Sequence, residues 1–168
     1  MVTIRPHKEI DIAYRVKWLN NPAVNKYIGD YPGQKTTTAK QKQWFSEYLK
    51  DRNKKFFTIC VDREPIGCLG LSHISLKNKN ADLFIMIGDN RYRGQGIGES
   101  SLRWLLDYGF NKLNLHKIKL TVIENNLAAV NLYKKIGFVV EGINVDEVFY
   151  QDKFYNFLEM AIFKESYQ

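Results

Sequence analysis

A glycine-rich stretch gives the clearest indication of chemistry in this chain. It runs Arg93-Gly94-Gln95-Gly96-Ile97-Gly98, follows the apolar run 83–87 and leads into the helical pattern of residues 100–110. A glycine-rich turn at the start of a helix exposes consecutive backbone N–H groups at the positive end of the helix dipole. Glycine lets that backbone approach a ligand closely and adopt positive φ. The stretch therefore predicts an anion site suited to a pyrophosphate.

The spacing of the glycines excludes two common phosphate-binding motifs. The P-loop pattern G-x-x-x-x-G-K-[ST] does not occur in the sequence. The dinucleotide-binding pattern G-x-G-x-x-G fails because the sixth position counted from Gly94 is Glu99. The pattern that remains is R-x-x-G-x-G, from Arg93 to Gly98. A purely structural turn at the start of a helix is the alternative.

A second motif indicates a protein family. Residues 126–138 resemble the signature N-x-x-A-x-x-L-Y-x-K-x-G-F of the GNAT superfamily of N-acetyltransferases at every defined position. The stretch 93–98 resembles the loop of the same family that binds the pyrophosphate of acyl-CoA. The two motifs lie in the family's order, with a helix and a strand between them. The resemblance covers residues 80–140 strongly and the flanks as a general pattern.

The resemblance implies acetyl-CoA as the acetyl donor. Its pyrophosphate would lie on the N–H groups of residues 94–99. Its pantetheine amides would pair with the backbone at the end of strand 81–88, where that strand diverges from the strand containing Thr121. The cofactor-binding residues expected on this basis are Met86, Ile87, Gly88, Arg93, Gly94, Gln95, Gly96, Ile97, Gly98, Glu99, Asn126 and Asn131.

Tyr133 is the candidate general acid. Acetyl transfer needs a free amine, a stabilised tetrahedral intermediate and a proton for the departing thiolate. On the predicted helix of the second motif, Asn126, Ala129 and Tyr133 share one face. A phenol with an ordinary pKa of roughly 10 is protonated at neutral pH and can supply that proton. Spacing alone favours a core tyrosine packed on Leu132 and Phe138, but the family's tyrosine at this position faces the thioester sulfur.

Asp82 is the candidate general base. It alternates with Phe84 and Met86, so the three side chains share a face of a regular strand, and that face could look into the cleft. The alternative is an aspartate at the start of a strand that holds a turn or pairs with Lys79. The reaction requires no metal ion, and none is expected.

The segment 18–27 is the candidate acceptor-binding region. It resembles the segment at the helix break in bacterial GNAT enzymes that acetylate nucleotide-linked amino sugars, as in the pseudaminic-acid pathway. Ribosomal-protein and polyamine acetyltransferases of the same branch share a looser version. Asn20, Asn25 and Tyr27 offer neutral hydrogen-bonding groups, and Trp18 and Tyr27 could stack on a sugar or a base. Trp18 as a simple core residue is an equal alternative.

The formal net charge of +7 narrows the choice of partner. The lysines are scattered and no reader motif occurs, which argues against nucleic acid. The basic segment 37–53 also carries acidic residues, which argues against a membrane surface. Positive potential over a cleft suits coenzyme A and a nucleotide-linked substrate. A polyamine site would need clustered carboxylates, and the sequence offers few candidates: Asp30, Asp82, Glu141 and Glu147.

The sequence therefore predicts an N-acetyltransferase acting on a small-molecule amine, with a nucleotide-linked amino sugar as the main expectation. The alternatives are a protein N-terminal or ribosomal-protein acetyltransferase, a polyamine acetyltransferase and a non-catalytic CoA-binding module. The oligomeric state stays open, and a homodimer is compatible with the sequence.

Composition indicates one cytoplasmic domain spanning residues 1–168. The length suits a single domain, and 45% hydrophobic residues suffice for a core. No apolar run reaches the roughly 18 residues of a membrane span, and the start of the chain lacks a signal-peptide pattern. Cys60 and Cys68 lie in strand-like runs and are expected to be buried free thiols in a reducing compartment, with a disulfide across the hairpin as the alternative.

Hydrophobic periodicity predicts the order of elements. The predicted helices cover residues 7–19, 36–52, 96–113 and 126–136, and Asn20-Asn21-Pro22 breaks the first of them. The predicted strands cover residues 2–5, 56–61, 65–76, 81–87, 116–123, 138–148 and 154–163. This order matches the α/β (α+β) GNAT fold, a mixed and mostly antiparallel central sheet with helices on both faces.

Overall fold

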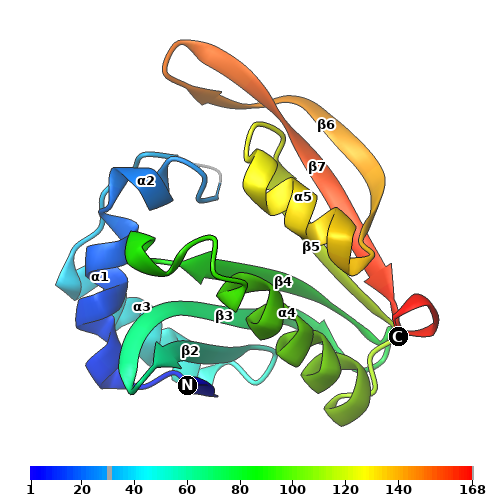
Figure 1. The fold of residues 1–168 in the computed structure, drawn as a ribbon, viewed down its shortest axis with the longest axis horizontal. Coiled ribbons are helices and arrows are strands. Elements are labelled where there is room, and N and C mark those ends of the chain that lie inside the picture. The colour runs from blue at the N-terminus through cyan, green and yellow to red at the C-terminus, as the bar shows by residue number, and fades with distance from the viewer. Residues whose placement is uncertain (30–31, 168) are drawn as a thin grey trace.

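A seven-stranded sheet organises the chain, with strand order β1-β2-β3-β4-β5-β7-β6 (Figure 1). The computed structural model describes residues 1–29 and 32–167. Every neighbouring pair of strands is antiparallel except β4 and β5, which are parallel. The mixed, mostly antiparallel sheet predicted from the sequence is confirmed. The strands are β1 (Val2–Pro6), β2 (Lys55–Val61), β3 (Glu64–Ser75), β4 (Asn80–Ile87), β5 (Lys117–Ile123), β6 (Val139–Tyr150) and β7 (Lys153–Phe163).

Helices cover both faces of this sheet (Figure 1). One face carries α1 and α3, and the other carries α4 and α5. The long helices begin and end close to the predicted limits, although the first starts later than expected, after the 3₁₀ turn η1 (Glu9–Asp11). The helices are α1 (Ile12–Leu19), α2 (Pro22–Asn25), α3 (Thr38–Lys50), α4 (Ile97–Asp107), which continues as a π-helical turn over Tyr108–Lys112, and α5 (Leu127–Ile136).

The short helix α2 was missed by the sequence analysis. Its start carries two standard signals: the side chain of Asn21 accepts a hydrogen bond from the N–H of Ala23, and Pro22 occupies the first turn. At four residues, the helix is too short to show a periodic apolar face. It lies between α1 and the segment that carries Tyr27.

The main apolar core lies between the sheet and the layer formed by α4 and α5. It joins Leu83 of β4, Leu105 of α4 and Val130 of α5, all at least 94% buried. The opposite face is closed by aromatic rings. Phe56 of β2 stacks on Trp44 and Tyr48 of α3, with ring centroids 5.4 and 4.8 Å apart. Both faces of the sheet are therefore covered in its β1–β4 part.

A buried polar network joins β1, η1 and β2 beneath α3. The carboxylate of Asp11 accepts two hydrogen bonds of 2.7 Å from Arg5 and one of 2.8 Å from the hydroxyl of Thr58. Burial favours the neutral acid, but the hydrogen bonds from Arg5, the backbone of Lys8 and Thr58 outweigh it and hold the pKa of Asp11 below its usual value. Because Thr58 donates its only proton to Asp11, it accepts from Nδ1 of His7 at 2.8 Å. Burial lowers the pKa of His7 to about 4, so this imidazole is neutral at pH 7.

Two further expectations concern the cysteines and membrane-spanning segments. Cys60 and Cys68 are buried free thiols, as predicted. No helix in the described part of the chain is long and apolar enough to cross a membrane.

Candidate active site

A gap opens between the two parallel strands at the centre of the sheet. β4 pairs with β5 only from Asn80 to Asp82, opposite Lys117 to Lys119. Beyond this point the strands diverge, and no ladder joins the rest of β4 to β5 (Figure 1). The resemblance implied such a divergence next to the strand that contains Thr121. The gap-facing backbone of β4 therefore has no partner strand, and its groups can pair with a ligand except where a side chain already binds them.

Backbone alternation decides which residues of β4 face the gap. The N–H of Gly88 donates to the carbonyl of Ile66 on the β3 side, at 2.9 Å. In an antiparallel pair, alternate residues direct their backbone groups to the same neighbour. Met86 and Gly88 therefore bond toward β3, while Ile85 and Ile87 direct their N–H and C=O groups to the gap. The carbonyl of Ile87 already accepts from the side chain of Arg93, which leaves its N–H for a ligand. Of the three residues expected to pair with pantetheine, only Ile87 faces it, and Ile85 was missed.

The glycine-rich loop has the geometry of an anion site. Gly94 and Gly96 adopt left-handed backbone conformations, with φ of 74° and 77°. Gly96 is the N-cap of α4, and the first helical hydrogen bond runs from Ser100 to Gly96. The N–H groups of residues 97–99 therefore have no partner within the helix. A Cβ on Gly94 or Gly96 would meet nothing within 4 Å, so the loop is open there, as an anion site requires.

The side chains around the loop are held by protein contacts. The amide of Gln95 donates to the backbone carbonyl of Arg91 at 2.7 Å. The carboxylate of Glu99 would repel a pyrophosphate, but Lys135 of α5 lies 2.6 Å from it and Arg103 lies 3.2 Å from it. These hydrogen bonds, the one from Lys135 first, hold the pKa of Glu99 below its usual value. The repulsion is thereby reduced, and two cations are placed beside the loop.

Arg93 does not direct its side chain to the phosphate loop. Its guanidinium donates to the carbonyl of Ile87 at 3.0 and 3.3 Å, and to the carbonyl of Ala23 at 3.2 Å. The sequence analysis placed Arg93 among the cofactor-binding residues. In the structure its side chain instead joins the end of β4 to α2.

Tyr133 lies in the core beside the gap. It is 7% exposed and belongs to the same hydrophobic cluster as Val122 of β5, against which Ile85 of β4 packs. Its ring packs against Phe138, with centroids 5.6 Å apart. Within residues 1–29 and 32–167, no group forms a hydrogen bond with its hydroxyl. Burial raises the pKa of Tyr133 to about 12, so the phenol is protonated at neutral pH.

The two asparagines of the second motif differ in their surroundings. The side chain of Asn126 caps α5 and accepts a hydrogen bond from the N–H of Ala129 at 3.4 Å. Asn131 is exposed on α5. Asn126 therefore has a structural task that orients the helix carrying Tyr133.

Two adjoining cavities lie on the side of the gap away from the phosphate loop. They have volumes of about 270 and 190 Å³, and Thr121 lines both. The larger is lined by Tyr27, Gly29, Thr121, Ile123, Asn144, Glu147 and Phe157. The smaller is lined by Asp82, Leu83, Lys119, Leu120, Thr121, Glu141, Glu159 and Met160. Because the donor loop begins α4 on the opposite face, an acceptor would reach the gap from these cavities.

Four carboxylates line the two cavities, and their partners differ. Asp82 lies 2.8 Å from Nδ1 of His73 and 3.3 Å from Lys119. Glu141 forms an ion pair of 2.6 Å with Lys117.

The other two have no cationic partner among the described residues. Glu159 accepts a hydrogen bond of 3.1 Å from the amide of Asn144, and Glu147 forms no ion pair. The acceptor side therefore holds two carboxylates that a bound cation could use.

The structure separates the four residues predicted to bind the acceptor. Trp18 is 2% exposed and packs on Gly88, where a Cβ would overlap its ring. It is a core residue, so the predicted stacking on a sugar or base is wrong. The side chain of Asn20 exchanges two hydrogen bonds, of 2.8 and 3.0 Å, with the backbone of Thr36. Its amide is used to hold the chain and is not free for an acceptor.

Asn25 and Tyr27 lie nearer to the larger cavity. Asn25 is 6% exposed, and its backbone carbonyl accepts from Gly33 and Ile28. Tyr27 lines the cavity, and the ammonium of Lys26 lies 4.7 Å from its ring centre. Of the four predicted residues, only Tyr27 is placed to touch an acceptor. Asp30 lies outside the described residues.

Glu159 was missed as a site residue. It lies on β7 directly opposite Thr121 of β5 and Gly142 of β6, so its position depends on two long-range pairings. The available signal was a charged residue interrupting the apolar run 157–163. Such a residue on a central strand marks a polar or functional surface.

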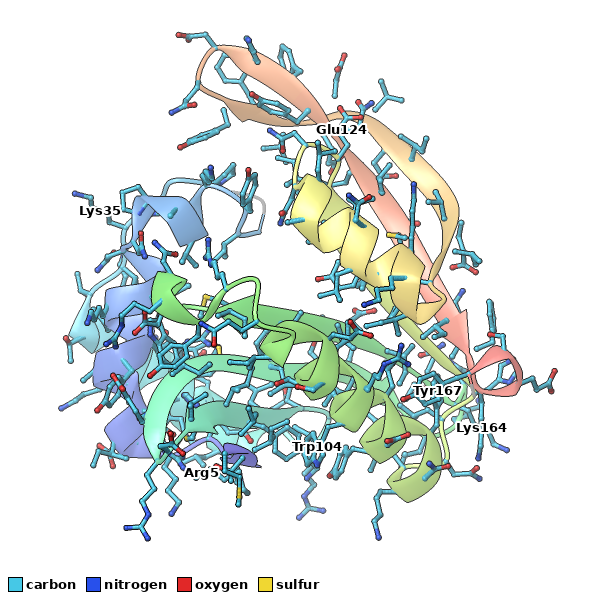
Figure 2. The ribbon with its side chains drawn as sticks, viewed as in Figure 1. Arg5, Lys35, Trp104, Glu124, Lys164 and Tyr167 are labelled. Atoms are coloured by element: carbon cyan, nitrogen blue, oxygen red, sulfur yellow. The ribbon has the colours of Figure 1, made fainter. Side chains whose placement is uncertain are left out.

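Glu124 joins the gap to the β6–β7 hairpin. Figure 2 shows it near the start of α5, beneath that hairpin. Its two carboxylate oxygens accept from the backbone N–H and the side-chain amide of Asn156, at 3.0 and 3.1 Å. These contacts fix the hairpin that carries Glu147 relative to β5.

Comparison with known proteins gives consistent results. Residues 1–139 match the family model described as an acetyltransferase (GNAT) domain. The spermidine N(1)-acetyltransferase of Escherichia coli K12 is 30% identical over 166 residues, which cover 99% of this chain and 88% of that protein.

Solved structures of an enzyme from Vibrio cholerae are similar in fold. The crystal structure of its spermidine N-acetyltransferase in complex with CoA and spermine has a TM-score of 0.89 and 27% identity, covering 99% of this chain and 97% of that one. A dodecameric structure of the same enzyme in an intermediate state has a TM-score of 0.83 and 26% identity, covering 98% and 94%.

Proposed function

Since the chain belongs to the GNAT acetyltransferase family, we propose that it transfers the acetyl group of acetyl-CoA to a primary amine of a polyamine. The donor and the reaction class are those of the family. The proposed acceptor rests on one observation: nearly the whole chain is similar to spermidine N-acetyltransferases. The acceptor-side carboxylates support the same choice.

The charge of the cavities favours a cationic amine. Glu147 and Glu159 line them without a cationic partner among the described residues. A polyamine carries several ammonium groups, and a carboxylate at a few Å stabilises each of them. The sequence analysis favoured a nucleotide-linked amino sugar because it expected few carboxylates near the cleft. The comparisons do not support that acceptor, and four carboxylates line the cavities.

The mechanism is direct transfer within the gap. Acetyl-CoA, the acetyl donor, would place its pyrophosphate on the N–H groups at the start of α4 and its pantetheine arm along Ile85 and Ile87. The amine would approach from the cavities that Thr121 lines. The backbone groups of β4 that face the gap orient the donor without side-chain chemistry.

Tyr133 would serve as the proton donor to the departing thiolate. With a pKa of about 12, its phenol stays protonated, which excludes a role as base at neutral pH. Its hydroxyl has no hydrogen-bond partner among the described residues, and the side chain is only 7% exposed, so a hydrogen bond to developing charge is stronger there than in water.

The acceptor must lose a proton before it attacks. Asp82 lines the smaller cavity, where its carboxylate contacts the imidazole of His73 and the ammonium of Lys119. Asp82 is the proposed base, and it would act through a water molecule.

A panel of acceptors tests this function. Release of the CoA thiol would be measured with spermidine, an N-terminal peptide and a nucleotide-linked amino sugar. We expect kcat/KM for spermidine to exceed the others by about tenfold or more, the discrimination that about 1.4 kcal/mol of transition-state binding provides. A preference for the amino sugar would overturn the polyamine proposal. Acetyl-CoA binding with no turnover of any amine would indicate a non-catalytic module.

A further inference from the structure

The guanidinium of Arg93 crosses the mouth of the gap. It donates twice to the carbonyl of Ile87, at 3.0 and 3.3 Å, and once to the carbonyl of Ala23, at 3.2 Å. Ile87 is the last residue of β4, and Ala23 lies in α2. One side chain therefore links the strand that binds the donor to a helix on the acceptor side.

The helix that Arg93 holds leads directly into the acceptor cavity. Four residues after Ala23, Tyr27 lines the larger cavity together with Gly29. The helix α2 spans only four residues, so it cannot hold its own position. Its buried residues Val24 and Asn25 anchor it to the protein, and the contact of Arg93 with the carbonyl of Ala23 ties it to the end of β4.

We propose that Arg93 is a positioning residue that holds the acceptor wall of the active site against the end of β4. It acts on the acceptor through α2 and Tyr27. Its backbone enters the phosphate loop, while its side chain does not take part in that loop. The inference needs the acetyltransferase activity but not the identity of the amine.

The chemistry of the guanidinium suits this task. It presents five N–H donors in a planar fork, so it can reach carbonyls of two separate elements at once. A lysine ammonium is a point charge on a flexible stem and holds such a geometry less well. Arg93 is exposed, and partial burial of its guanidinium lowers its pKa while the group remains charged.

Arg91 offers a matched control. It lies two residues earlier in the same loop and carries the same charge. Its guanidinium binds Asp89 at 2.7 Å and Glu64 at 3.0 Å, and it makes no contact with α2 among the described residues. Arg91→Met therefore removes one positive charge near the phosphate loop without removing the link to α2.

The test compares Arg93→Met, Arg93→Lys and Arg91→Met in the full chain. The amine with the highest kcat/KM in the acceptor panel serves as substrate. For Arg93→Met we expect a KM for the amine raised by about tenfold, an acetyl-CoA Kd within about threefold of the parent, and a smaller loss in kcat. Arg93→Lys should restore part of the KM, and Arg91→Met should leave it unchanged.

A second measurement does not depend on turnover. Hydrogen exchange of the amides of residues 23–28 should become faster in Arg93→Met, and stay at the parent rate in Arg91→Met. This readout still tests the link if no amine of the panel is acetylated.

Two outcomes would overturn the inference. An acetyl-CoA Kd raised by about tenfold or more, with the amine KM unchanged, would make Arg93 a ligand of the phosphates. Unchanged exchange at residues 23–28 would show that Arg93 does not hold α2. Failure of spermidine in the panel, by contrast, would refute only the proposed acceptor.

Discussion

The donor side and the acceptor side of the gap are built in different ways. The proposed donor side consists mainly of backbone groups from one contiguous stretch, β4 with the loop that follows it, together with the side chain of Tyr133 on α5. The acceptor side consists of side chains from several separate segments, among them Tyr27, Asp82, Thr121, Glu147 and Glu159. Backbone geometry is specified by local motifs, whereas the cavity lining requires the whole sheet to assemble first.

The two sides also differ in the charge that they present to a ligand. The chain carries a net charge of +7, which suits the phosphates of coenzyme A. The acceptor cavities nevertheless gather four carboxylates against one lysine in their lining. Because interactions between exposed charges fade within about 10 Å in salt, the local set decides what binds there. Net charge is therefore a poor guide to the acceptor.

The substitution Tyr133→Phe should have the largest effect and would test whether the donor side supplies chemistry. It removes the hydroxyl and keeps the packing on Phe138. We expect kcat to fall by about 10²–10⁴, the range for a positioned acid, with kcat/KM falling alike. Acetyl-CoA affinity and Tm should stay close to the parent values. Single-turnover kinetics would measure the chemical step, and normal turnover in a stable variant would leave Tyr133 with a purely structural role.

The substitution Gly96→Asp should break the donor side at the loop. An aspartate is strained at a φ of 77°, and its carboxylate would face the pyrophosphate. Repulsion at about 4 Å in an effective dielectric near 20 amounts to about 4 kcal/mol, or roughly a thousandfold loss of acetyl-CoA affinity. Calorimetry on the folded variant measures this. The control Gly29→Asp has similar positive φ and lies away from the loop, so it should bind acetyl-CoA normally. Equal affinity in Gly96→Asp would refute the assignment of the loop.

Acid pH should weaken the scaffold on the α1–α3 face, which rests on the buried network of His7 and Asp11. The pKa of His7 is about 4 in the folded protein against 6.5 unfolded, so the unfolded state binds more protons between these values. Stability is full above pH 6.5 and falls as the pH drops toward 4, by about 3 kcal/mol at pH 4 from this group. The depressed pKa of Asp11 adds a loss at still lower pH.

Urea unfolding across this pH range measures the effect. The substitution His7→Asn keeps a polar group near Thr58 and should flatten the slope of stability against pH between 4 and 6.5. The substitution His116→Asn changes an exposed histidine and should keep the parent slope. A parent-like slope in His7→Asn would assign the acid sensitivity to other groups.

The substitution Glu147→Gln should have the smallest effect and would sharpen the account of the acceptor side. The carboxylate is exposed, so its attraction for an ammonium is screened and worth about 0.2–1 kcal/mol, or up to about fivefold in KM for spermidine. The difference should shrink in high salt. Glu165→Gln, at an exposed site outside the cavities, is the matched control. An unchanged KM at low salt would remove Glu147 from the acceptor site.

The sequence by itself determined the reaction class and the acetyl donor, and it predicted where the donor binds. The glycine-rich loop and the motif 126–138 are contiguous, so their geometry follows from local backbone rules, and the predicted strands and long helices match the structure. The sequence does not show which residues of β4 direct their backbone groups to the gap, because this depends on how β4 pairs with β3. Met86 and Gly88 were therefore expected at the gap, and Ile85 was missed.

Only the tertiary structure decided the acceptor side. Trp18 was an equally good candidate for stacking and for the core until its ring was found on Gly88. Glu159 reaches the cavity because β7 pairs with β5 and β6, and Arg93 reaches α2 across 70 residues of sequence. Side chains that meet through long-range pairings carry no local pattern, since their spacing along the chain is set by the path of the fold and not by helix or strand periodicity.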